Sequence, residues 1–176
     1  IDTLAQRHGD KVRLSEVAMA VSGDSLQGEM EIEEPDALLQ MRRRIRESED
    51  MEVEIPTDLN AVLRDYQEDG VRWMLRMTSW GAGVCLADDM GLGKTLQTIA
   101  VMLSRKSEGA QMVVAPASVA GNWRREVERF APSLNIVMLN ELNINDRASA
   151  VSELGPGDLL VLTYGLLVSE CENLIS

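Results

Sequence analysis

Glycine, lysine and threonine are spaced in the middle of the sequence as a phosphate-binding loop requires. Gly91 and Gly93 would form a tight turn, and Lys94 and Thr95 follow it directly. Glycines let a backbone wrap around a phosphate without side-chain clashes, and the unpaired N–H groups at a helix N-terminus attract anions. Lys94 would then reach the β and γ phosphates of a nucleoside triphosphate, and the Thr95 hydroxyl would bind Mg²⁺.

The predicted loop runs from Asp88 to Thr95, with Lys94 and Thr95 as its catalytic residues. It follows the general pattern GxxxxGK[ST], except that Asp88 stands where the first glycine is usual. That departure disfavours ordinary P-loop kinases and GTPases. The residues of this segment that we expect to contact a bound nucleotide are Asp88, Met90, Gly91, Leu92, Gly93, Lys94, Thr95 and Leu96.

Alternating apolar runs and amphipathic segments predict the elements that hold this loop. Strands are expected at residues 83–87, 111–115, 136–139 and 158–163. Helices are expected at residues 59–80, 94–105, 119–130 and 146–154. Because the strands are too uniformly apolar to have a wet face, this order predicts an α/β fold, with a parallel sheet flanked by helices on both sides.

Residues 1–57 differ from the rest and are assigned to a short, acidic flanking segment of mixed or helical structure. Helices are expected after Ser15 and at residues 35–47, where Pro35 suits a first helical turn. The arginines at residues 42–46 are interleaved with acids, which is typical of a solvated helix surface. Residues 58–176 are assigned to the α/β domain.

Composition and charge exclude several classes of function. The 176 residues carry a net charge of −12 and a pI near 4.5, so any contact with DNA must be local. His8 is the only histidine, which excludes histidine metal sites and Ser/His/Asp triads. Apolar stretches such as residues 159–162 are far too short to span a bilayer, so no membrane contact is expected.

The cysteines and the first residue bear on where the protein resides. Cys85 and Cys171 have no ligand spacing, which favours a reducing, intracellular compartment. Cys85 lies in the apolar run 84–87 and is expected to be buried. The chain opens at Ile1 without a secretory signal, so we interpret it as an excised piece of a longer protein.

The loop and the helix before it resemble a known family. Ala87 to Gln97, ADDMGLGKTLQ, resembles the nucleotide-binding motif of Swi/Snf-type ATPases in helicase superfamily two, which usually reads ADEMGLGKT. Upstream, LRDYQ resembles the LRPYQ of this family, with Asp65 where proline is common. The family's glutamine recognises adenine, so the resemblance implies that Gln67 does the same and that the nucleotide is ATP.

Two downstream segments extend the resemblance and concern DNA. Residues 113–118, VVAPAS, resemble motif Ia, which lies along one DNA strand, and this implies backbone contacts by Pro116 and Ser118. Residues 160–165, LVLTYG, resemble motif Ib, which implies that the Thr163 hydroxyl meets a phosphate. Arg124 is a further candidate for contact with DNA.

The resemblance spans about residues 59–170 and implies a RecA-like N-terminal lobe, incomplete because the family's next motif, Asp-Glu-Ala-His, does not occur. It implies that the parent is a DNA-dependent ATPase that translocates on double-stranded DNA and remodels a protein target. The present chain alone should be inactive in hydrolysis, and an exposed sheet edge should let it self-associate. We expect it in the cytoplasm of a bacterium or the nucleus of a eukaryote.

Two alternatives are open at this point. One is a P-loop NTPase of another class, which does not predict the surroundings of Gln67 or Pro116. The other is a non-catalytic, acidic interaction module with a degenerate P-loop. An ATP titration with and without Lys94→Ala would separate the second alternative from a motor.

Overall fold

The computed structural model describes residues 36–175, and the chain divides into two compact units, Ile1–Met51 and Glu52–Ser176. In the first unit the described part is mainly one helix, α3 (Asp36–Glu49). It confirms the helix expected at residues 35–47, and its exposed ion pair between Arg43 and Glu47, 2.8 Å long, suits a solvated surface. The helix expected after Ser15 lies outside the described residues. The domain assignment 1–57 and 58–176 stays a prediction.

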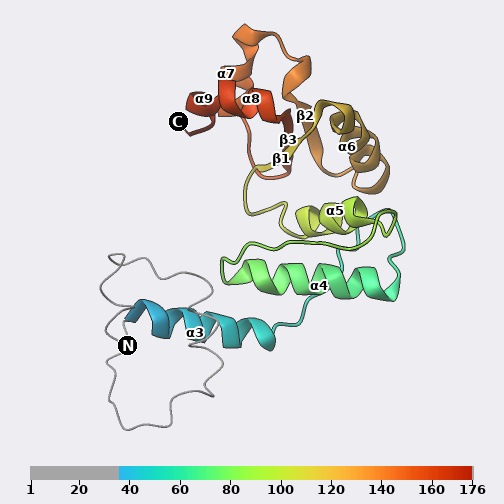
Figure 1. The fold of residues 1–176 in the computed structure, drawn as a ribbon, viewed down its shortest axis with the longest axis vertical. Coiled ribbons are helices and arrows are strands. Elements are labelled where there is room, and N and C mark those ends of the chain that lie inside the picture. The colour runs from blue at the N-terminus through green and yellow to red at the C-terminus, as the bar shows by residue number, and fades with distance from the viewer. Residues whose placement is uncertain (1–35, 176) are drawn as a thin grey trace. The chain divides into compact units, whose positions relative to one another are not determined.

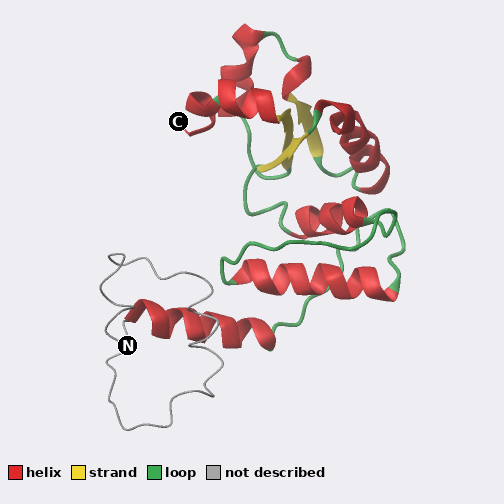
Figure 2. Cartoon of the chain, in the orientation of Figure 1, coloured by secondary structure: helices red, strands yellow, loops and turns green. Residues whose placement is uncertain are grey.

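The second unit contains a three-stranded parallel sheet, drawn as yellow arrows in Figure 2. Its strands are β1 (Gln111–Ala115), β2 (Asn135–Met138) and β3 (Asp158–Thr163). They lie in the order β1-β3-β2, so the last strand along the chain is the central one. The prediction of a parallel sheet is confirmed, with β2 one residue earlier than expected.

Both faces of the sheet are covered, as the uniformly apolar strands predict. Leu159 and Val161 of β3 belong to the main core, to which α4 (Asp65–Ser79), α5 (Lys94–Ser104) and α6 (Ala117–Phe130) also contribute. Leu160 and Leu162 alternate to the opposite face. There they pack with a short 3-10 helix, η1 (Leu139–Glu141), and with side chains of α7 (Ile144–Ser152), α8 (Tyr164–Ser169) and α9 (Cys171–Ile175). Figure 1 shows α6 and α8 on opposite sides of the strands.

The helix expected to begin at residue 59 begins six residues later, at Asp65. Residues 59–64 are instead tied to the end of α6, where the Asn60 backbone N–H donates to the Phe130 carbonyl at 2.7 Å and its side chain donates to the Arg129 carbonyl at 3.0 Å. Arg64 is extended, with φ −78° and ψ 158°, and caps α4. Long-range hydrogen bonds therefore override the helical pattern before Asp65.

An ionic clamp holds the same segment. The Lys106 ammonium and the Ser133 hydroxyl both donate to the Asp58 carboxylate, the latter at 2.8 Å. The bond from Lys106 is the main reason that the pKa of Asp58 lies below its ordinary value, and the bond from Ser133 adds to it. The clamp joins the segment before α4 to the turns that follow α5 and α6.

The strand expected at residues 83–87 is wrong. These residues are irregular, and no described residue pairs with them in a ladder. A strand exists only through hydrogen bonds to a neighbour, so an apolar run without a paired neighbour stays a loop. The expected burial of Cys85 is wrong for the same reason, because its side chain is exposed.

A pair of charged side chains joins α7 to the junction of α8 and α9. Arg147 donates to Glu170 at 2.9 Å, and Asn173 donates to the same carboxylate at 2.8 Å. The bond from Arg147 is the main reason that the pKa of Glu170 lies below its ordinary value. Among residues 36–175, no helix is long and apolar enough to cross a membrane.

Candidate functional site

The glycines of the predicted phosphate loop adopt the backbone that only glycine enters readily. Gly91 has φ 86° and Gly93 has φ 77°, both in the left-handed region. Gly93 caps α5, which begins at Lys94 as predicted. An added β-carbon on Gly93 would also lie 2.4 Å from the Gln67 side-chain nitrogen. Both the backbone and its neighbour therefore require glycine at this position.

The backbone N–H groups of residues 83–96 make no hydrogen bond to any described part of the chain, and those of residues 91–96 belong to the glycine turn and the start of α5. The first amide of α5 with a backbone partner is that of Gln97, which donates to the Gly93 carbonyl at 3.0 Å. Unpaired amides at a helix N-terminus carry partial positive charge, and the helix dipole adds to it. The loop is thus built to accept an anion with several oxygens.

Lys94 lies over this loop. Its ammonium donates to the backbone carbonyls of Asp88 and Asp89, at 2.5 and 2.8 Å. These are the only hydrogen bonds that its side chain makes to the described residues. The cation is therefore held at the loop by groups that a phosphate oxygen could replace.

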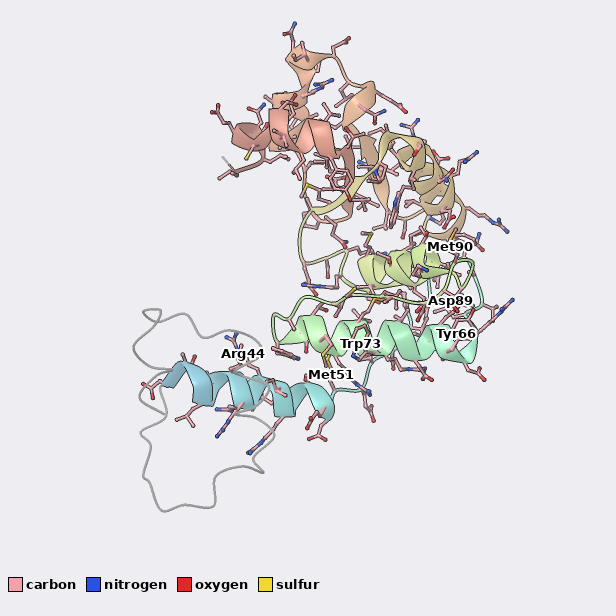
Figure 3. All side chains as sticks on the ribbon, viewed as in Figure 1. Arg44, Met51, Tyr66, Trp73, Asp89 and Met90 are labelled. Carbon is pink, nitrogen blue, oxygen red and sulfur yellow. The ribbon has the colours of Figure 1, made fainter. Side chains whose placement is uncertain are left out.

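The other predicted nucleotide contacts line the same turn. Asp88 and Met90 are exposed, Met90 with 97% of its surface, while Leu92, Thr95 and Leu96 are half-buried. Figure 3 shows Asp89 and Met90 at the same end of α4 and α5 as Tyr66. The Thr95 hydroxyl makes no hydrogen bond within the described residues, which leaves it available as an oxygen ligand.

Gln67, far away in sequence, is brought against the loop by α4. Its side-chain oxygen accepts from the Arg64 backbone N–H at 3.0 Å, and its side-chain nitrogen donates to the Leu92 carbonyl at 3.1 Å. The amide has a second N–H and a second lone pair, so both bonds leave it one donor and one acceptor for a ligand. The predicted link between Gln67 and the loop is present.

Tyr66 and Gln97 also belong to the site, although the sequence analysis assigned neither of them a role there. The Tyr66 hydroxyl donates to the Leu92 carbonyl at 3.3 Å, and the Gln97 side-chain nitrogen donates to the same oxygen at 3.5 Å. Gln97 is fully buried, although a glutamine on the apolar face of a helix is unusual. A glutamine among the apolar positions of residues 94–105 was the signal in the sequence that could have identified Gln97 as a site residue.

The residues expected to contact DNA lie together at the carboxyl edge of the sheet. Ala115, the last residue of β1, is the register partner of Thr163, the last residue of β3. Pro116 follows Ala115 and caps α6, and Ser118 is exposed in the first turn of that helix. The Thr163 hydroxyl accepts from the Leu166 backbone N–H at 3.4 Å and so caps α8.

Arg124 is not available as a free cation near this edge. Its guanidinium pairs with Glu141 at 2.6 Å, which joins α6 to η1. The groups at this edge that carry no ion pair are the hydroxyls of Ser118 and Thr163 and the N-terminus of α6. Among residues 36–175, no group of three or more His, Cys, Asp or Glu side chains could hold a metal ion.

Comparison with protein families matches residues 66–176 to the SNF2-related domain. A Bacillus subtilis (strain 168) protein, provisionally named ATP-dependent helicase/translocase YwqA, is 36% identical over 139 residues, which cover 76% of this chain and 15% of that protein. The Arabidopsis thaliana ISWI chromatin-remodeling complex ATPase CHR17 is 39% identical over 122 residues, covering 65% of this chain and 11% of that protein. The chain thus spans only a small part of the curated relatives that it matches.

Among solved structures, the Sulfolobus solfataricus SWI2/SNF2 ATPase core in complex with dsDNA matches with a TM-score of 0.60 and 40% identity. The match covers 69% of this chain and 25% of that one. A second solved structure, the Sulfolobus solfataricus SWI2/SNF2 ATPase core domain, matches with a TM-score of 0.54 and 39% identity, covering 66% of this chain and 23% of that one. The expected RecA-like fold is confirmed by this likeness.

Proposed function

Because this chain belongs to the family of the SNF2-related domain, we propose that it is the ATP-binding part of an ATP-dependent, double-stranded DNA translocase. The observation that carries the proposal is the row of six unpaired amides at residues 91–96, with the Lys94 ammonium beside them. The family match also removes the alternative of a P-loop NTPase from an unrelated class.

In the proposed site the triphosphate replaces the carbonyls of Asp88 and Asp89 as the partner of Lys94. The ammonium would exchange two neutral carbonyl acceptors for an anionic oxygen, and so gain the Coulomb attraction between opposite charges. The amides of residues 91–96 bind the remaining phosphate oxygens. Lys94 and Thr95 are therefore the residues that we propose for catalysis.

The loop also suits a magnesium ion that arrives with the nucleotide. Mg²⁺ usually takes one or two protein oxygens and completes its shell with phosphates and water. The unpaired Thr95 hydroxyl, one residue after Lys94, offers one such oxygen. When bound, the ion neutralises charge on the β and γ phosphates.

Gln67 is proposed to select adenine. The amide that touches the loop keeps one N–H and one lone pair uncommitted, which is the pair of groups that the adenine edge requires. The neighbouring Tyr66 ring is partly exposed and is tied to the same loop carbonyl. A base and the phosphates could thus be bound from one junction of α4 and α5.

The DNA backbone is proposed to lie along the carboxyl edge of β1 and β3, at Pro116, Ser118 and Thr163. The pairing of Ala115 with Thr163 supports the proposal, since it places both motifs side by side. The related archaeal core was solved in complex with dsDNA. A protein target of remodelling, and a location in the cytoplasm of bacteria or the nucleus of eukaryotes, complete the proposal.

Calorimetric titration of the chain with MgATP and MgGTP tests the nucleotide part of the proposal. We expect ATP to bind more tightly than GTP, and Gln67→Met to reduce that preference. Gln111→Met is the matched control, because the Gln111 side chain donates to the Met102 carbonyl, at the other end of α5. Equal affinities for ATP and GTP in the unaltered chain would contradict adenine recognition.

A further inference from the structure

The Leu92 carbonyl is surrounded by side-chain donors from two helices. Tyr66 and Gln67 of α4 and Gln97 of α5 all donate to this one oxygen, at 3.3, 3.1 and 3.5 Å. In a trans peptide the carbonyl and the next N–H point in opposite directions. Holding the Leu92 oxygen toward these donors therefore turns the Gly93 N–H away from them, and that N–H has no acceptor in the described chain.

Gln97 is a costly residue for a purely structural role. Its side chain is fully buried, and its side-chain oxygen has no hydrogen-bond partner among the described residues. Burying a polar group without a partner is unfavourable, and an apolar residue of similar size would fill the space without that cost. Its hydrogen bond to Leu92 is what an apolar residue could not supply.

Gly70 provides the space for this side chain. A β-carbon on Gly70 would lie 2.2 Å from the Gln97 side-chain oxygen, far inside any allowed contact. Any other residue at position 70 would therefore push Gln97 from its position beside the loop. The Gln97 side chain of α5 thus packs directly against Gly70 of α4.

We propose that Gln97 is a positioning residue for nucleotide binding, which with Tyr66 and Gln67 fixes the Leu92–Gly93 peptide so that the Gly93 N–H faces a bound phosphate. The inference rests on the proposed nucleotide site. Gln97 itself does not touch the ligand. It acts on the phosphate through one peptide group, whereas Gln67 is proposed to touch adenine as well.

The test is a double-mutant cycle with Gly70→Ala and Gln97→Ala, read out as affinity for MgADP and for inorganic tripolyphosphate. Each single variant should weaken binding of both probes by about threefold to tenfold, the effect of one typical hydrogen bond. In the Gln97→Ala background, Gly70→Ala should cause no further loss of affinity for either probe, because the alanine then fills the space that the Gln97 side chain has vacated. Gly70→Ala favours helix formation, so the variant should stay folded.

Gly121→Ala is the matched control, because Gly121 lies in helix α6 with open space where its β-carbon would be. It should leave both affinities unchanged. The proposal would be overturned if Gly70→Ala reduced affinity equally in the unaltered chain and in Gln97→Ala. Unchanged affinities in both single variants would also overturn it. So would a loss of ADP binding without a loss of tripolyphosphate binding.

A second measurement does not depend on nucleotide binding. In glycine-selective ¹⁵N spectra of the ligand-free chain, the Gly93 amide resonance should move in Gln97→Ala and stay in place in Gly121→Ala. If the unaltered chain binds no MgADP, the proposed function fails. The Gly93 resonance would still decide the peptide orientation, and an unmoved resonance in Gln97→Ala would refute it.

Discussion

The Lys94 ammonium lies 2.5 Å from the backbone carbonyl of Asp88 and donates a hydrogen bond to it. The charge is thus kept at the loop by a neutral group that a nucleotide phosphate can displace. We expect Lys94→Met to lower affinity for MgATP by about tenfold to a hundredfold, the range for hydrogen bonds to charged groups. Arg105→Met, which removes an exposed cation from the other end of α5, should leave the affinity unchanged in the same titration. Equal losses in both variants would show a general charge effect and contradict a specific role for Lys94.

Binding without turnover is expected of this chain. Phosphoryl transfer to water needs a residue that orients the water, and the acidic segment expected for that role, Asp-Glu-Ala-His, does not occur in the sequence. Near the loop, the candidates are Asp88 and Asp89, which precede the glycines and belong to the phosphate-binding turn. We expect phosphate release at background rate with or without duplex DNA. DNA-stimulated release that Lys94→Ala abolishes would contradict this expectation.

Duplex DNA should bind weakly and with strong salt dependence, because the chain has a net charge of −12 and Arg124 is paired with Glu141. Ser118→Ala and Thr163→Val should each reduce affinity by about twofold to tenfold, whatever the DNA sequence. Fluorescence anisotropy at several salt concentrations measures this. Ser152→Ala, which removes an exposed hydroxyl from α7, is the control. Tight binding at physiological salt would show that the basic surface lies elsewhere.

The clamp at Asp58 should make stability depend on pH. Its folded-state pKa lies below the ordinary value of 3.8, so the clamp stabilises the fold above that pH and is lost as pH falls through the folded-state pKa. Asp58→Asn should lower the free energy of unfolding at pH 7 by about 0.5 to 1 kcal/mol, since the pair is partly exposed. Urea denaturation should show this difference shrink toward pH 3. Asp69→Asn, at an exposed position, should have little effect at either pH. A difference that grows on acidification would exclude the clamp as its cause.

Self-association should follow from the open edges of the sheet. Neither β1 nor β2 has a second strand neighbour among the described residues, and open edges template pairing with another chain. Sedimentation should show association that rises with concentration and weakens in Met112→Lys, which places a charge on β1. Val62→Lys changes a residue that is 95% exposed outside the strands and should behave as the unaltered chain does. Strictly monomeric sedimentation at all concentrations would refute this prediction.

Much of the fold was predictable because local sequence and tertiary structure agree there. β1 and β3 have the predicted bounds, and α5 begins at Lys94, where glycine at position 93 caps the helix. The sequence could not reveal that residues 83–87 form no strand, because an apolar run indicates a strand whether or not a neighbour pairs with it. The start of α4 depends on hydrogen bonds from Asn60 to α6, which no local pattern reveals.

The candidate site likewise contains residues that local sequence predicts and residues whose role depends on the packing of distant segments. The glycines and Lys94 lie close together in sequence, so their spacing alone predicts the loop. Gln67 was found through the family resemblance, while the convergence of Tyr66 and Gln97 on the Leu92 carbonyl depends on how α4 packs against α5. The need for glycine at position 70 likewise follows only from the position of the Gln97 side chain.

The central position of β3 constrains how the chain folds. β1 and β2 each pair only with β3, although both precede it in the sequence. During synthesis they would have no ladder partner until residues 158–163 emerge, and the main core would lack Leu159 and Val161 until then. Non-local pairing of this kind slows folding and prolongs the exposure of strand edges. Neither ladder of the sheet can therefore form before β3 is available to pair.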